Sequence, residues 1–138
     1  MAQSIDGVIT IEYKFMHSSE RTPWIEYWVV NSNGFYVTRI CWTSGGAGHP
    51  SNPEDFNGNT EVIDTGYYYC AVNVSRYLGT RVLLDLSHTY NASLAIGNRA
   101  IECTHNSYCM VELVVRKLNL LDYLLVKFSL LRLYLREN

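Results

Sequence analysis

Residue types that could perform catalysis are scattered along this sequence. Neither the G-x-S-x-G turn of a serine nucleophile nor the G-x-G-x-x-G phosphate loop occurs. Asp and Glu form no closely spaced pair on one strand face, so the acid pair of a glycosidase has no support. His105 lies between Cys103 and Cys109, but these separations fit no common metal site. We therefore predict a protein that is not an enzyme and uses no metal or cofactor. The histidines stand apart from one another: His17, His49, His88 and His105.

Aromatic residues offer a second kind of chemistry, the stacking of a ring on a sugar. The chain has 11 Tyr, 4 Phe and 3 Trp, and such residues suit strands and recognition surfaces. Trp24 follows Pro23, and Trp42 stands at the head of the Gly-rich stretch 43–60. For both, a core position and an exposed stacking position stay open. Trp28, set among apolar neighbours, is expected in the core or an interface.

Composition indicates one globular domain over residues 1–138. Hydrophobic residues make up 48 % and charged residues 17 %, with a net charge of -2. A basic excess is absent, so no nucleic-acid partner is expected. The start of the chain has no secretory leader pattern. Leu-rich residues 118–135 contain Asp122, Lys127 and Arg132, which argues against a membrane span or membrane insertion.

The four cysteines leave the redox state open. They are Cys41, Cys70, Cys103 and Cys109, and no C-x-x-C pair occurs among them. Without a leader pattern, free thiols are favoured over disulfides. If a disulfide forms, Cys103 and Cys109 are the expected pair, because a hairpin could bring them together.

The elements that must position these residues are mostly strands. Residues 24–30 and 35–42 flank a hairpin turn at 31–34, and 67–75 is the clearest strand. Strands without crossover helices indicate an antiparallel sandwich or barrel. Residues 8–16 fit a strand or a short helix, and 129–138 are equally ambiguous. Further strands are expected at 81–86, 94–102, 109–115 and 123–128.

A D-x-G-x-Y-x-C pattern runs from Asp64 to Cys70. It is typical of a strand in an immunoglobulin-type sandwich, where the Tyr closes a corner. Cys41 is too near in sequence for the usual bridge between sheets, and Trp42 directly follows it. The pattern therefore predicts a sandwich strand and not an antibody-like domain.

Several short motifs, in their common order, resemble the fungal immunomodulatory proteins, which are small lectin-like proteins of mushrooms. The resemblance covers most of the chain in pieces. It departs from the family in an apparent insertion at 25–51, in the four cysteines, and in Phe128 where the family has Trp. The motifs are Ile9-Thr10-Ile11-Glu12 with Phe15, Thr22-Pro23-Trp24, Asn52-Pro53-Glu54-Asp55-Phe56, Tyr67, Tyr69 and Arg76 with Leu78-Gly79, Tyr90-Asn91 with Ile96, and Val114-Val115 with Asp122-Tyr123-Leu124-Leu125 and Phe128.

The resemblance implies an immunoglobulin- or fibronectin-III-like antiparallel β-sandwich over 19–128. A short N-terminal helix within 1–18 would exchange between two copies in a non-covalent homodimer, and 129–138 would extend beyond the usual end. The resemblance also implies glycan binding on cell surfaces, agglutination of red cells and stimulation of lymphocytes. Members of that family act outside the cell without a cleaved leader, so an extracellular location is expected. The alternative expectation is the cytoplasm of a producing fungus.

The expected glycan contacts are two stacking tryptophans, one carboxylate and one C-terminal ring. The expected dimer contacts are three apolar residues near the start. A rival interpretation is an interaction module without a sugar site, in which residues 118–135 bury a protein interface; a membrane-active toxin is a weaker third. The glycan residues are Trp24, Trp42, Asp55 and Phe128, and the dimer residues are Ile9, Ile11 and Phe15.

Overall fold

The described part of the chain is built of strands. The computed structural model describes residues 8–17, 21–43, 56, 59–86, 91–101, 109–117 and 121. Within these residues, antiparallel pairing joins every strand to a neighbour. The strands are β1 (Ile9–Met16), β2 (Pro23–Asn31), β3 (Gly34–Trp42), β4 (Glu61–Asp64), β5 (Tyr69–Gly79), β6 (Arg81–Asp85), β7 (Ser93–Ile96), β8 (Arg99–Ile101) and β9 (Met110–Val114).

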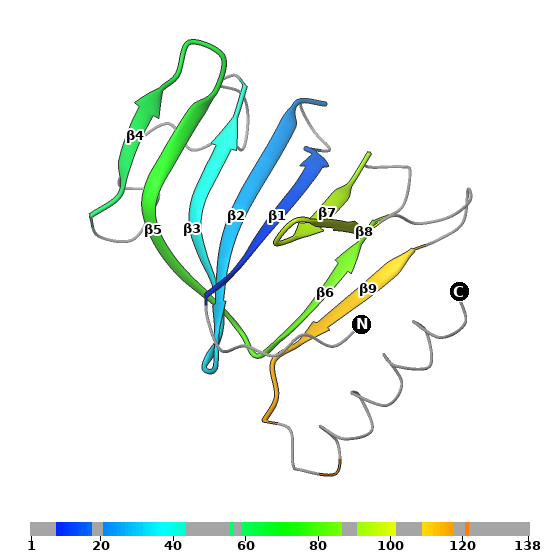
Figure 1. Cartoon of the computed structure of the whole chain (residues 1–138). Helices are drawn as coiled ribbons and strands as arrows, with labels where there is room; N and C mark the ends of the chain where they lie inside the picture. Colours follow the sequence, from blue (N-terminus) through cyan, green and yellow to red (C-terminus); the bar gives the residue numbers. More distant parts are fainter. Residues whose placement is uncertain are drawn as a thin grey trace.

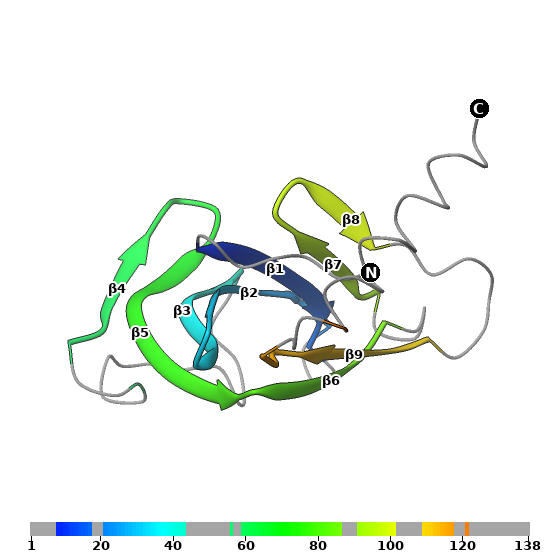
Figure 2. The same cartoon turned by 60° about the horizontal axis from the view of Figure 1, so that its bottom comes forward.

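The strands form two antiparallel sheets (Figure 1). The larger sheet has the order β4-β5-β3-β2-β1-β7-β8, and the smaller one pairs β6 with β9. The small sheet lies below the β1–β7 side of the large one, so the core is enclosed between them (Figure 2). The expected mainly-β antiparallel sandwich is confirmed.

Alternation along the strands builds the core, because successive side chains of a strand point to opposite faces. On β2, Trp24, Trp28 and Val30 face the core and are buried. Ile11 of β1 and Val37 of β3 lie on the same face. The outer face carries a smaller buried group, made of Ile25, Cys41 and Cys70 with Tyr27 and Tyr68 packed against it.

Two glycines shape the passage from the large sheet to the small one. Gly79 ends β5 with φ 99°, and β6 begins two residues later, so the chain turns from one layer into the other (Figure 2). Gly34 starts β3 with φ 137°. A Cβ there would lie 2.4 Å from the carbonyl oxygen of Gly79. Any side chain at residue 34 would therefore clash with backbone that it cannot displace cheaply.

The expected N-terminal helix is wrong within the described residues. Residues 9–16 form β1, which pairs with β2 along its whole length and with β7 on its other edge. The i, i+4, i+7 spacing of Ile9, Tyr13 and Met16 is typical of a helix. In the structure, every second side chain from Ile9 to Phe15 packs on the core instead, as in a strand. Two flanking strands supply backbone partners that a short isolated helix lacks.

Two other segments differ from expectation. The single strand expected over 94–102 is a hairpin of β7 and β8, turned at Gly97 with φ 55°. Strand β4 was not anticipated at all; it is short and mostly exposed, so its hydrophobic signal is weak. The expected strands at 24–30, 35–42, 67–75, 81–86 and 109–115 are confirmed to within a few residues. The segments 123–128 and 129–138 lie outside the described residues.

Candidate functional site

A carboxylate lies inside the core of the large sheet. Glu26, on β2 between Trp24 and Trp28, is only 8 % exposed. Its Oε1 accepts hydrogen bonds from Trp24 Nε1 at 3.2 Å and from Arg76 Nη2 at 2.7 Å. Its Oε2 accepts one from Trp28 Nε1 at 2.9 Å. Three donors, one of them cationic, therefore compensate the buried charge.

This arrangement follows from strand alternation. Residues 24, 26 and 28 share the core face of β2, so each indole reaches the carboxylate between them. Arg76 comes from β5, two strands away, and pairs in register with Val37 of β3. Glu26 also raises the pKa of the Tyr13 hydroxyl, although burial of Tyr13 is the larger cause. Because every acceptor oxygen is already engaged, the cluster is suited to anchoring the core.

The two tryptophans expected to stack on a glycan are brought together, but inside the protein. Trp24 is 9 % and Trp42 is 2 % exposed. Their rings stack on each other at 6.0 Å, and Trp42 also stacks on Phe56 at 6.1 Å. Their faces are thus occupied by other rings. Trp28, at 2 % exposure, lies in the core as expected. We call this region the aromatic end, comprising Phe15, Trp24, Trp42, Phe56 and Tyr69.

The other expected site residues are placed as follows. Asp55 and Phe128 lie outside the described residues. Ile9, Ile11 and Phe15, expected at a dimer contact, all point to the core of their own chain, and Ile11 is buried there. Of the histidines, only His17 is described; its ring lies 5.7 Å from that of Trp24.

The expectation of free thiols is wrong. Cys41 and Cys70 are opposite one another on β3 and β5, and they form a disulfide with a Cα–Cα distance of 4.1 Å. The disulfide joins neighbouring strands of one sheet. The sequence separation of the two cysteines is too short for the usual bridge between two sheets, but a bridge within one sheet does not require a longer one. Cys109 is disulfide-bonded as well. Cys103, its expected partner, lies outside the described residues.

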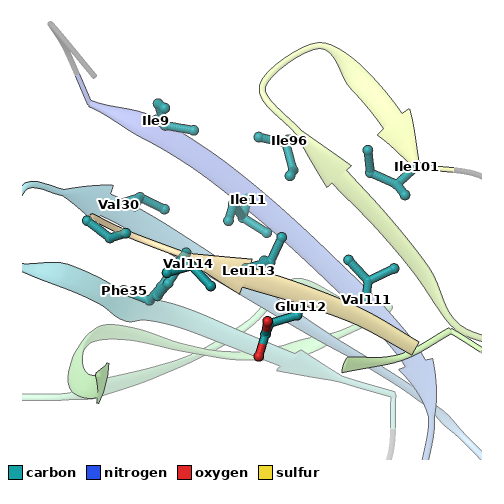
Figure 3. A pocket seen from close by; sticks show the side chains of 11 residues that line it. Ile9, Ile11, Val30, Phe35, Ile96, Ile101, Val111, Glu112, Leu113 and Val114 are labelled. Carbon is teal, nitrogen blue, oxygen red and sulfur yellow. The ribbon is translucent and has the colours of Figure 1, made fainter. Parts of the chain in front are cut away.

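A pocket opens at the opposite end of the sandwich (Figure 3). Its volume is about 390 Å³, and it lies between the start of β1, the β7–β8 hairpin and β9. All but one of its lining residues are apolar. We call this region the pocket end. It is lined by Ile9, Ile11, Val30, Phe35, Ile96, Ile101, Val111, Glu112, Leu113, Val114 and Val115.

Among the described residues of the pocket wall, Glu112 is the single ionisable one. Its Oε1 accepts a hydrogen bond of 2.5 Å from Arg81 Nε on β6. This hydrogen bond is the main cause that lowers the pKa of Glu112, so the carboxylate stays ionised at neutral pH. Both partners are substantially exposed, and strand alternation puts them on the outer face of the small sheet. The ion pair thus lies on the solvent side of the pocket rim, where solvent screens it.

The pocket could not be predicted from the sequence. The alternating apolar residues of β1 and β9 were visible, but a hollow depends on which side chains meet across the layers.

Among the described residues, no group of three or more His, Cys, Asp and Glu side chains could hold a metal ion. A search of the same residues for a helix long and apolar enough to cross a membrane finds none.

One protein-family model matches the chain. It is described as a domain of unknown function (DUF1850), and it covers residues 11–103, more than half of the 138 residues. The chain therefore belongs to the DUF1850 family. The match spans β1 to β8 and ends before β9, so one wall of the pocket lies beyond it. Neither the curated proteins nor the solved structures contain a match.

Proposed function

We propose that this member of the DUF1850 family is a binding module that holds an apolar ligand at the pocket end. The observation that carries the proposal is the cavity of about 390 Å³, whose described lining is ten apolar residues and Glu112. The Glu112 carboxylate points away from the hollow, to the opposite face of β9 from Val111 and Leu113 (Figure 3). Ligand sites are commonly about 300–1,000 Å³, with apolar walls and few polar groups. The lining thus favours a ligand held mainly by burial of its apolar surface.

The contrast with the rest of the core supports this use. Protein interiors are close-packed, and a hollow leaves its lining without partner atoms on one side. Leu94, in the centre of the same core, is 1 % exposed, while its neighbours Ile96 and Ile101 border the pocket. An apolar ligand would supply the missing contacts at about 25 cal/mol for each Å² of apolar surface removed from water.

Isoleucine methyl groups provide the test. Ile9, Ile11, Ile96 and Ile101 line the pocket, whereas Ile25, Ile40 and Ile63 lie elsewhere. Methyl-labelled protein is titrated with a straight-chain alkanol and followed by NMR. We expect saturable shifts at the four pocket isoleucines and little change at the other three. Shifts spread evenly over these seven described isoleucines, or no shifts at all, would show that the pocket does not bind the probe.

A matched pair of variants links binding to the cavity. Ile96→Trp places a large ring in the pocket and should abolish alkanol binding. Ile63→Trp makes the same change on exposed β4, away from the pocket, and should leave binding unchanged. Circular dichroism confirms that both variants fold. Equal binding by both would place the alkanol somewhere other than this pocket.

Glycan binding by a homodimer, the function implied by the resemblance to fungal immunomodulatory proteins, stays a second candidate. The specific observation in its favour is a pair of exposed tyrosines, Tyr67 in the turn between β4 and β5 at 75 % exposure and Tyr77 on β5 at 54 %. The cation of Arg39 lies 5.4 Å from the ring centre of Tyr27 on the outer face. A glycan array, with the solution mass recorded alongside, tests this candidate. Selective binding that is lost in Tyr67→Ala would support it, and a folded protein that binds no glycan would remove it.

We also propose that the protein works in an oxidising compartment. The support is the Cys41–Cys70 disulfide, since structural disulfides persist mainly outside the cytosol. This favours the extracellular expectation over the cytoplasmic one. Thiol labelling of protein purified from its native source is the test, and reactive thiols at residues 41 and 70 would contradict the proposal.

A further inference from the structure

Strand β9 forms one wall of the pocket and has a strand partner on one side only within the described residues. It pairs antiparallel with β6, from Arg81 opposite Val114 to Asp85 opposite Met110. Among the described residues, this sheet contains only these two strands, so within them the side of β9 away from β6 is an open edge. Such an edge presents a row of backbone N–H and C=O groups that can pair with another extended chain.

The ladder shows which backbone groups point to that edge. Leu86 N donates to Cys109 O, and Val115 N donates to Thr80 O. In an antiparallel pair, hydrogen-bonded and non-hydrogen-bonded residues alternate. The backbone hydrogen bonds of β9 to β6 are thus made by residues 109, 111, 113 and 115. The N–H and C=O groups of the residues between them point to the open edge. These residues are Met110, Glu112 and Val114.

The open edge of β9 runs beside the pocket. Glu112 and Val114, whose backbone groups point outward, both belong to the pocket lining. Figure 3 shows Val111 and Leu113 of β9 facing the same hollow as Ile96 and Ile101 of the β7–β8 hairpin. Strand β8 is the last strand of the large sheet. Within the described residues, the pocket thus lies between an edge strand of each sheet.

We infer that the ligand of this pocket is an extended polypeptide segment that adds to β9 as a new strand. This inference rests on the proposed function, and it names the class of ligand. Every second side chain of the added strand would enter the pocket, and the lining favours aliphatic side chains at those positions. Side chains between them would face solvent near Glu112, so a basic residue suits that side.

The open edge is the reason to choose a peptide over an alkyl chain. An alkyl chain can fill the hollow, but it offers nothing to the N–H and C=O groups of Met110, Glu112 and Val114. An extended peptide satisfies these groups while its side chains fill the pocket, as in other cases of strand addition. Backbone pairing supplies affinity, and the pocket supplies selectivity for apolar residues at alternate positions.

The test uses two synthetic peptides on the full-length, methyl-labelled protein. The first is about eight residues long, with alternating valine and threonine between terminal lysines. The second has the same side chains, but its backbone amides facing the protein are N-methylated, so that it cannot pair as a strand. We expect the first peptide to shift the four pocket isoleucines and the second to bind at least about tenfold more weakly.

Two proline variants test the edge itself. Met110→Pro removes an N–H that points to the open edge, outside the β6–β9 ladder, at a residue that does not line the pocket. It should weaken the first peptide at least about tenfold, while alkanol binding persists. Leu83→Pro is the matched control, because residue 83 occupies the equivalent ladder position on β6, at the opposite edge. It should leave peptide binding unchanged. Circular dichroism establishes that both variants keep the strand content of the parent.

The outcomes separate this inference from the function on which it rests. Alkanol binding without peptide binding, or equal binding of both peptides, overturns strand addition and leaves the apolar pocket as a ligand site. Pocket isoleucine shifts that depend on protein concentration alone would identify a second copy of the chain as the occupant, and would also overturn it. Failure of both the alkanol and the peptides removes the proposed function together with the inference.

Discussion

The two ends of this sandwich are filled by different side chains, and they differ in how completely they are packed. At the aromatic end, Trp24, Trp42 and Phe56 stack in series, and large rings occupy the space between the strands. At the pocket end, Ile11, Ile96 and Val111 border a cavity of about 390 Å³. Rings from neighbouring strands reach across the core, whereas shorter aliphatic side chains leave a hollow between the layers. The same strand pairing can thus produce a closed region and an open one.

The acidic residues of the two ends also differ, in their burial and in the number of donors that they bind. Glu26 is buried and binds three donors, so its charge is compensated within the protein. Glu112 lies at an exposed rim and binds one arginine. The first is placed to stabilise the core, and the second faces solvent on the outer side of β9.

Removal of the Glu26 carboxylate should have the largest effect on stability. Glu26→Ala leaves two indole N–H groups without an acceptor and Arg76 without its partner. We expect a loss of about 4 kcal/mol in the free energy of unfolding. Denaturant unfolding measures it. Glu112→Ala, the matched carboxylate at the rim, should change stability far less. Similar losses in the two variants would contradict the difference between the ends.

Loss of the Cys41–Cys70 disulfide should come next. This bond spans a sequence separation of 29 residues and covers the outer face behind the aromatic end. We expect the double variant Cys41→Ala/Cys70→Ala to lose about 3 kcal/mol, mainly because its unfolded chain is less constrained. Thermal unfolding without reductant measures the change. Isoleucine methyl spectra should show the pocket end intact, and a collapsed pocket would mean that the two ends are not independent.

Gly34→Ala should cost about 2 kcal/mol, because its Cβ would lie 2.4 Å from the Gly79 carbonyl oxygen and φ is 137°. Gly97→Ala is the control. It also has positive φ, but a Cβ there has no neighbour within 4 Å. It should cost about 1 kcal/mol. Urea unfolding of the two variants separates close approach from backbone conformation, and equal costs would exclude the clash as the cause.

Added volume should be tolerated at one end only. Ala71, on β5 beside the aromatic end, is 0 % exposed. We expect Ala71→Leu to cost about 2 kcal/mol through overpacking. Ile96→Phe adds volume where the pocket has room and should change stability by less than about 0.5 kcal/mol. Chemical denaturation of both variants is the measurement. A cost for Ile96→Phe as large as that for Ala71→Leu would show that the pocket is not available space.

The rim ion pair should show the smallest effect. Arg81 lowers the pKa of Glu112 below its ordinary value of 4.5. The contribution of the pair is therefore present above the unfolded-state pKa and is lost as pH falls through the lower, folded-state pKa. In Arg81→Gln the pKa of Glu112 should rise toward its ordinary value, with little change in stability at neutral pH. An NMR titration of the Glu112 carboxyl follows this, and an unchanged pKa would show that the pair does not form in solution.

Much of the fold could be predicted because hydrophobic alternation is a local property. The strands around Trp28, Val37 and Val74 have continuous apolar and aromatic signals, and the turn before Gly34 has its usual residues. Strand β4 has only four residues and little burial, so its signal was too weak. The apolar residues of the β1 segment fitted both the helical period and the strand period. Only pairing with the two neighbouring strands decided in favour of a strand.

The candidate site was much less predictable. The sequence drew attention to Trp24 and Trp42 by type and position, and the structure turned both toward the core. It could not reveal that Glu26 would meet Arg76 across an intervening strand. Nor could it join Cys41 to Cys70, since their register depends on how β3 and β5 align. Each of these contacts joins residues from separate strands.

By itself, the sequence determined the antiparallel β class and most of its strands, because alternation and turn chemistry act over a few neighbouring residues. Tertiary structure alone decided which face of each tryptophan is covered, which cysteines are bonded and where a hollow remains. The physical reason is that burial, register and cavity volume arise only when strands distant in sequence pack against one another. The pocket beside the open edge of β9 is a property of that packing.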